Sequence, residues 1–117
     1  RGEYGHDLID ELQPQVGEPV IDKPGYCAFA ATDLELILRT RGIDSLIITG
    51  VTTEVCVSST LRSAIDRGFN CLTVSDACAS AHPELHAAAL AMINVEGGIF
   101  GEVCDSAALL SALREAA

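Results

Sequence analysis

The chain has 117 residues, which is enough for one domain with a core of ordinary size. Hydrophobic residues make up 49% of it and aromatic residues only 4%, so we expect a packed core of Ala, Val, Leu and Ile and exclude a disordered chain. The formal net charge of −10, without any cluster of Lys or Arg, argues against nucleic acid as a partner and is typical of an acidic cytoplasmic protein.

Residues 1–19 are polar and contain glycine and proline, which predicts a loop or arm with a turn of helix at 7–12. A short strand is predicted at 20–22, directly before Lys23. A helix is predicted over 32–42, because Thr32 and Glu35 have the spacing of a capping box and Gly42 can provide the left-handed end.

The rest of the chain alternates strands with helices. The apolar run SLIITG at 45–50 predicts a strand covered on both faces, and a helix follows over 53–68. The remaining predicted elements are a strand at 70–76, a helix at 82–93, a strand at 98–105 and a helix at 106–117. This alternation predicts a single α/β domain over 1–117, with a mostly parallel sheet, flanking helices and right-handed crossovers.

Five cysteines stand at positions 27, 56, 71, 78 and 104, and no two of them form a C-x-x-C pair. The odd number and the spacing argue against a zinc knot and against the disulfide framework of a secreted domain. Free thiols in a reducing compartment fit better, because a thiol packs as a small hydrophobic group. No apolar run is long enough to span a membrane and no secretory signal is recognised, so no membrane partner is expected.

Polar residues follow the predicted strand ends, which is where parallel α/β sheets bind ligands. Lys23, the turn at 52–56 and Asp76 all stand in this position. Cys56 lies in the first turn of its predicted helix, where free backbone N–H groups and the helix dipole favour a thiolate. It is therefore either a nucleophile, assisted by an ammonium such as Lys23, or an inert packing cysteine.

Plainer interpretations stay open for the other polar residues. Lys23 alone is also typical of a solvated surface charge, and Asp76 is favoured as a helix cap or turn residue. His6, His82 and His86 lack the further ligand that a metal site needs, so surface or capping roles are favoured. The four other cysteines are predicted to be packing thiols.

Three stretches carry a family resemblance: VIDKPG at 20–25, GVTTEVCV at 50–57 and SDACAS at 75–80. In this order and spacing, the sequence from about residue 17 to its end resembles the isochorismatase-like cysteine hydrolase superfamily. The resemblance implies a Rossmann-type three-layer fold. It makes Cys56 the nucleophile and Lys23 the cation that holds the thiolate and the developing charge.

The resemblance implies further features of the site. Backbone N–H groups of Thr52 and Cys56 would form an oxyanion hole, and a non-proline cis peptide would join Val51 to Thr52. The reaction would be hydrolysis of a C–N amide bond through a thioester, without a metal or organic cofactor. GVTTEVCV resembles the amidohydrolases of ureido and carbamoyl compounds, and GHDLIDEL with EGGIFGE points most towards the biuret-hydrolase-like branch. Glu96 is then a candidate for contacting substrate N–H groups, or else an exposed loop acid.

One part of the family pattern is missing. The superfamily has a third catalytic residue, an aspartate in a DxQ setting upstream of the lysine, whereas Asp7 and Asp10 stand in a different context. The N-terminal strands of the fold are missing as well, so the chain looks like its C-terminal part. We therefore expect a partner, either a complementary N-terminal piece or a second copy in a homo-oligomer, to supply the aspartate strand. The alternative is a non-catalytic remnant or subunit of the same fold.

Overall fold

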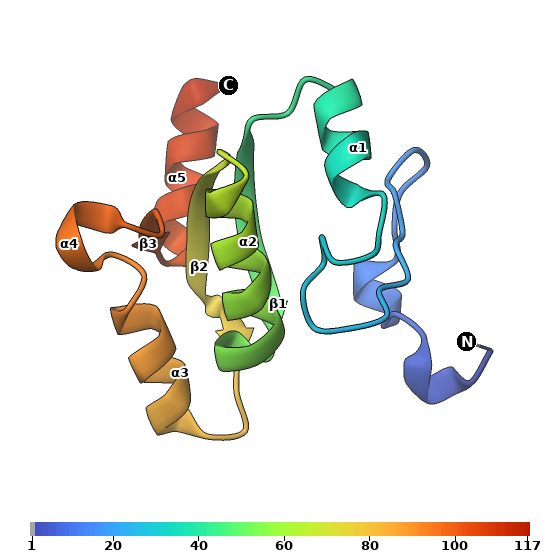
Figure 1. Cartoon of the computed structure of the whole chain (residues 1–117), viewed down its shortest axis with the longest axis horizontal. Coiled ribbons are helices and arrows are strands. Elements are labelled where there is room, and N and C mark those ends of the chain that lie inside the picture. Colours follow the sequence, from blue (N-terminus) through green and yellow to red (C-terminus); the bar gives the residue numbers. More distant parts are fainter. Residues whose placement is uncertain (1) are drawn as a thin grey trace.

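The computed structural model describes residues 2–117, which form a three-stranded sheet flanked by helices (Figure 1). Strands β1 (Ser45–Val51), β2 (Asn70–Ala79) and β3 (Glu102–Cys104) lie in the order β1–β2–β3, and both pairings are parallel. The predicted α/β fold with a parallel sheet and flanking helices is confirmed.

Five α-helices and a π-helical turn connect and cover the strands. Their bounds are α1 Leu34–Thr40, the π-helical turn Thr53–Val57, α2 Ser58–Asp66, α3 Pro83–Ala91, α4 Val95–Gly98 and α5 Ser106–Ala116. Figure 1 shows α2 lying across the sheet, with α1 and the N-terminal segment to one side of it and α3 and α4 to the other. The arm predicted at 1–19 is described from residue 2, and residues 2–19 form two short 3-10 turns, Tyr4–His6 and Asp10–Leu12.

The two faces of the sheet are covered by different helices. On one face, Cys71 of β2 belongs to a core that includes Leu38 of α1 and Leu61 of α2. Side chains alternate across a strand, so residues at even positions of β2 face the other way. Asp76 contacts Ser106 at the start of α5 with both carboxylate oxygens, so α5 covers the second face. The result is a layer of helices on each side of the sheet.

A bulge separates the two ends of the pairing between β1 and β2. Ile48 pairs with Thr73, but Gly50 pairs with Cys78, so the intervening residues of β2 have no partner in β1. Gly50 has a φ of +124°, a conformation that a residue without a side chain adopts readily. The bulge lets β2 continue to Ala79, three residues beyond its predicted end at 76. It also places Asp76 next to α5.

Two local predictions in the first third of the chain are wrong. Residues 20–22 belong to no strand, because no strand of the described residues pairs with them to supply hydrogen bonds. Thr32 and Glu35 do not form a capping box. The Thr32 hydroxyl donates to the carbonyl oxygen of Ala28 (2.5 Å) and accepts from the backbone N–H of Leu34 (3.3 Å).

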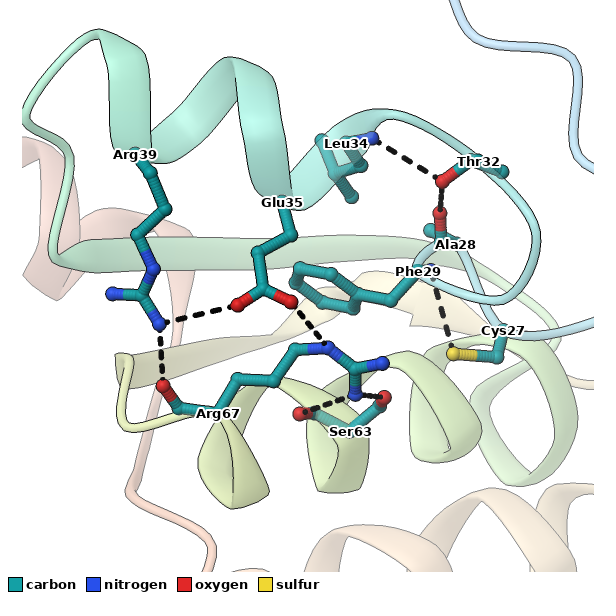
Figure 2. A network of polar contacts seen from close by, with 9 residues as sticks. All are labelled: Cys27, Ala28, Phe29, Thr32, Leu34, Glu35, Arg39, Ser63 and Arg67. Carbon is teal, nitrogen blue, oxygen red and sulfur yellow. Dashed lines mark hydrogen bonds and ion pairs between the residues drawn. The ribbon is translucent and has the colours of Figure 1, made fainter.

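Glu35 instead joins α1 to the end of α2 (Figure 2). Its carboxylate accepts from Arg67 Nε at 3.0 Å and pairs with Arg39 at 3.4 Å. Each guanidinium also lies over an aromatic ring, Arg39 at 4.2 Å from the centroid of Phe69 and Arg67 at 5.0 Å from that of Phe29. These contacts hold α1 and Phe29 against the end of α2.

The last predicted strand is shorter than expected. It was predicted over 98–105, but only Glu102–Cys104 pair with β2. Gly101 has a φ of +95°, and a Cβ at this position would collide with the carbonyl oxygen of Cys71. Residues before it form α4, where Glu96 and Gly97 have positive φ. None of the helices in residues 2–117 combines the length and the apolar character that crossing a bilayer requires.

Candidate active site

The structure brings Lys23 and Cys56 together. The ammonium Nζ of Lys23 lies 3.7 Å from the Sγ of Cys56 and donates to the carbonyl oxygen of Gly25 at 2.7 Å. Lys23 is exposed and Cys56 is half-buried, so the pair lies at the surface, open to a small molecule. An ammonium at this distance can stabilise negative charge that develops on Sγ during a reaction.

Cys56 lies in the π-helical turn Thr53–Val57, which we call the cysteine turn. The turn follows the end of β1 directly and leads into α2. The peptide bond between Val51 and Thr52 is cis, at the position that the family resemblance implies. The carbonyl oxygen of Thr52 accepts from the backbone N–H groups of both Val55 (3.0 Å) and Val57 (3.2 Å). This wider turn starts the helix that the sequence predicts at 53.

A cavity of about 270 Å³ lies between the Lys23 segment and β1. Its polar lining includes Lys23, Cys56 and Thr60, and its aliphatic lining includes Ile47 and Val51 from β1. The volume is near the lower end for small-ligand sites, which suits a substrate of a few atoms. No Asp or Glu of residues 2–117 is among the residues that line it. The arrangement can therefore provide a nucleophile and a cation, but no carboxylate for proton transfer.

Asp76 contacts the start of α5 from β2 and is not part of this site. It accepts from the backbone N–H of Ser106 at 2.7 Å and from its hydroxyl at 2.6 Å, at the first turn of α5. The hydroxyl and then the backbone N–H of Ser106 hold the pKa of Asp76 below its ordinary value of 3.8, because both stabilise the carboxylate. The sequence favours Asp76 as a local cap or turn residue, but it lies inside β2, and the N-cap residue of α5 is Asp105.

Two further predicted residues lie away from the cavity. Glu96 is exposed on α4, at the opposite side of the molecule from the N-terminal segment in Figure 1, and it is not among the residues that line the cavity. His82 is exposed and lies 3.8 Å from Glu84 on α3. Within the described part of the chain, no three His, Cys, Asp or Glu side chains gather as a metal ion would require.

Sequence reasoning missed the role of His86. Its Nδ1 lies 2.8 Å from the hydroxyl of Thr53, the first residue of the cysteine turn, and Thr53 is only 1% exposed. The next residue, Glu54, accepts from the hydroxyl of Ser80 at 2.9 Å. Both partners lie far along the sequence, so no local pattern could have indicated these contacts.

All five cysteines are free, and they differ in their environments. Burial raises the pKa of the Cys71 and Cys78 thiols above the ordinary value of 9.0, as expected of packing cysteines. Cys27 lies in the segment shown in Figure 2 and accepts from the backbone N–H of Phe29 at 3.4 Å. Burial opposes ionisation of Cys27, but a hydrogen bond from the Ser63 side chain and nearby backbone N–H groups bring its pKa below 9.0 overall.

Comparison with known proteins finds a matching family and similar sequences. The sequence profile of the isochorismatase domain matches residues 1–108. The ureidoacrylate amidohydrolase RutB of Methylobacterium radiotolerans is 44% identical over 114 residues, which is 97% of this chain and 43% of that protein. The chain therefore spans less than half the length of this relative.

Solved structures with the same architecture include two bacterial hydrolases. An isochorismatase-like hydrolase from Alkaliphilus metalliredigens superposes with a TM-score of 0.88 at 37% identity, over 97% of this chain and 60% of that one. A cysteine hydrolase from Pseudomonas syringae pv. phaseolicola superposes with a TM-score of 0.87 at 30% identity, over 95% of this chain and 56% of that one.

Proposed function

The chain belongs to the isochorismatase family, and we propose that it forms part of the active site of a hydrolase that cleaves a C–N bond in a small ureide or carbamoyl compound. The observation that carries the proposal is the 3.7 Å contact between Lys23 Nζ and Cys56 Sγ at the edge of an open cavity. A free cysteine beside an ammonium, directly before a helix, is the arrangement that activates a thiolate nucleophile.

The reaction starts when the Cys56 thiolate attacks the substrate carbonyl carbon. A C–S bond forms, and the carbonyl electron pair moves to oxygen, where the backbone N–H groups of Thr52 and Cys56 receive the negative charge. Collapse of this intermediate breaks the C–N bond, and the nitrogen leaves with a proton as ammonia or an amine. Water then hydrolyses the thioester and restores the thiol. Lys23 stabilises the thiolate at the start and the end of the cycle.

The leaving nitrogen must receive a proton, and the attacking water must lose one. Both transfers need an acid or base that the cavity lining does not contain. We propose that polypeptide outside these residues supplies it, as an aspartate on a strand that pairs with the open edge of β1. Two observations support this proposal. β1 is an outer strand of the described sheet, with Ile47 51% and Val51 68% exposed, and the chain spans less than half of its ureidoacrylate-hydrolysing relative. The strand would come from a complementary piece or from a second copy.

The substrate is best represented by a ureido acid. The relatives named as ureidoacrylate amidohydrolases support such a compound, and Lys23 adds a positive charge to the cavity that attracts a carboxylate. Biuret, which the motifs GHDLIDEL and EGGIFGE favour, is the competing substrate of the same chemical class. The free thiols support a reducing compartment such as the cytoplasm as the place of the reaction.

The test is to capture the thioester. The chain is mixed with a polypeptide that contains the DxQ strand, incubated with ureidoacrylate or biuret, and quenched in acid for peptide mass spectrometry. We expect a substrate-derived mass on Cys56 and ammonia or amine in solution, and no adduct on the half-buried Cys104, which serves as the matched thiol. Substrate turnover without an adduct on Cys56, unchanged in Cys56→Ser, would contradict the mechanism.

The alternative is a subunit that keeps the fold without catalysis, and the absence of a carboxylate from the cavity lining favours it. Iodoacetamide labelling separates the two proposals before any substrate is known. Preferential labelling of Cys56 near neutral pH supports the enzyme, whereas equal labelling of Cys56 and Cys104, both half-buried, supports the subunit without catalysis.

A further inference from the structure

The cysteine turn packs against α3 through its first residue. Thr53 is 1% exposed, and its hydroxyl lies 2.8 Å from Nδ1 of His86, on the helix that starts at Pro83. In one ring tautomer the Thr53 hydroxyl donates to Nδ1, and in the other Nδ1–H donates to the hydroxyl, so the contact is kept in both. A buried hydroxyl depends on such a partner, because water does not reach it.

A second contact ties the same turn to the same neighbouring segment. The Ser80 hydroxyl donates to Glu54 at 2.9 Å and accepts from the backbone N–H of His82 at 3.0 Å. Two successive residues of the turn, Thr53 and Glu54, are thus held by the stretch from Ser80 to His86. Lys23 approaches Cys56 from elsewhere, on a segment in which the backbone N–H of Ala28 donates to the Thr60 hydroxyl of α2 at 2.9 Å.

The segments that carry Nζ and Sγ are therefore held by different contacts. Displacing a reactive group by about 1 Å can reduce its reactivity by a large factor, even when the altered residue does not touch it. Loss of the Thr53–His86 contact would release the start of the turn, three residues before Cys56, and leave the Lys23 segment where it is.

We propose that His86 is a positioning residue for Cys56, acting through the buried hydroxyl of Thr53. The proposal rests on the proposed function only in treating Cys56 as the reactive thiol. His86 does not line the cavity beside Cys56, so it holds the turn and does not take part in the reaction. Its effect is therefore measurable as thiol reactivity, whether or not a ureide is hydrolysed.

The experiment compares His86→Ala and His86→Asn with wild type, and uses His82→Ala as the matched control, since His82 is exposed at the start of the same helix. Each protein is treated with iodoacetamide at neutral pH, and alkylation of Cys56 and of the buried Cys78 is followed by peptide mass spectrometry. We expect Cys56 alkylation to slow at least threefold in His86→Ala, with Cys78 unchanged. The Asn side chain places a hydrogen-bonding group near the position of Nδ1, so His86→Asn should restore most of the rate.

Two results would overturn the proposal. Faster alkylation of Cys78 together with Cys56 would show general loosening of the fold, and an unchanged Cys56 rate would show that the contact does not set the turn. If His86→Ala does not fold, Thr53→Val gives the same test, because it keeps the shape of the buried side chain and removes only its hydroxyl. Thr53→Ser keeps the hydroxyl and should behave as wild type. Absence of ureide hydrolysis in wild type would count against the proposed function and leave this test intact.

Discussion

Replacing Lys23 by methionine should slow alkylation of Cys56 by a small and calculable factor. Methionine keeps an unbranched side chain and removes the charge that lies 3.7 Å from Sγ. Two opposite charges at this distance attract by about 1 kcal/mol in water and by about 4 kcal/mol near a less hydrated surface. Since Lys23 is exposed, the lower figure applies, and losing an attraction of about 1 kcal/mol can slow a reaction that places negative charge on Sγ by at most about fivefold.

The expected change in the alkylation rate is smaller than this upper limit. A thiolate that is less stabilised is also more nucleophilic, with a Brønsted slope of about 0.4–0.5, which returns roughly a factor of two. Alkylation of Cys56 in Lys23→Met should therefore be about two- to threefold slower than in wild type.

The assay is iodoacetamide labelling at neutral pH, with the rate at each cysteine read by peptide mass spectrometry. Lys23→Arg, which keeps the charge, should slow the alkylation of Cys56 much less. Arg114→Ala, which removes a charge from the last turn of α5, should leave the Cys56 rate unchanged. A Cys56 rate in Lys23→Met that equals wild type, or that falls equally in Arg114→Ala, would refute the electrostatic role of the Lys23 contact.

Three further predictions follow from residues outside the cavity. Cys27 should be alkylated before Cys71 at neutral pH, because hydrogen bonds lower the pKa of the first thiol although burial opposes this, and burial raises the pKa of the second. Chemical denaturation of Asp76→Asn should show reduced stability at pH 7. Because the pKa of Asp76 is lowered by folding, this deficit should shrink as the pH falls below 3.8 and the native carboxylate is protonated. Arg67→Ala should cost about 1–2 kcal/mol of unfolding free energy, from a partly exposed ion pair and a cation–π contact, and a loss no larger than that of Arg114→Ala would count against this estimate.

Most of the regular elements from residue 45 onward could be predicted because each depends on a local pattern. The apolar run at 45–50 forms β1, and the sequence that starts at Pro83 forms α3. The strand at 20–22 could not be predicted correctly, because a strand exists only where a neighbour accepts its hydrogen bonds. Glu35 has the correct spacing for a capping box with Thr32, but its carboxylate binds Arg67, at the end of α2, instead.

In the candidate site, too, local patterns predict some residues, whereas others depend on packing between distant segments. The sequence predicts that Lys23 and Cys56 meet, because each follows a predicted strand and each lies in a motif of the family. The structure places Nζ and Sγ 3.7 Å apart. The polar environment of Cys27 and the contact between Thr53 and His86 depend on packing between elements that are distant in sequence. A loop motif alone suggests Glu96 as a contact to substrate N–H groups, but Glu96 lies on α4 and is not among the residues that line the cavity.

The most direct test of the account is ureide hydrolysis by Cys56→Ala, measured as ammonia or amine release in the presence of the polypeptide that carries the DxQ strand. Alanine is smaller than cysteine and the site is only half-buried, so circular dichroism and the melting temperature should change little. The account predicts that turnover falls to the uncatalysed rate while the variant stays folded, because no other thiol lines the cavity among the described residues. Turnover that persists in a folded Cys56→Ala protein would contradict the assignment of Cys56 as the nucleophile.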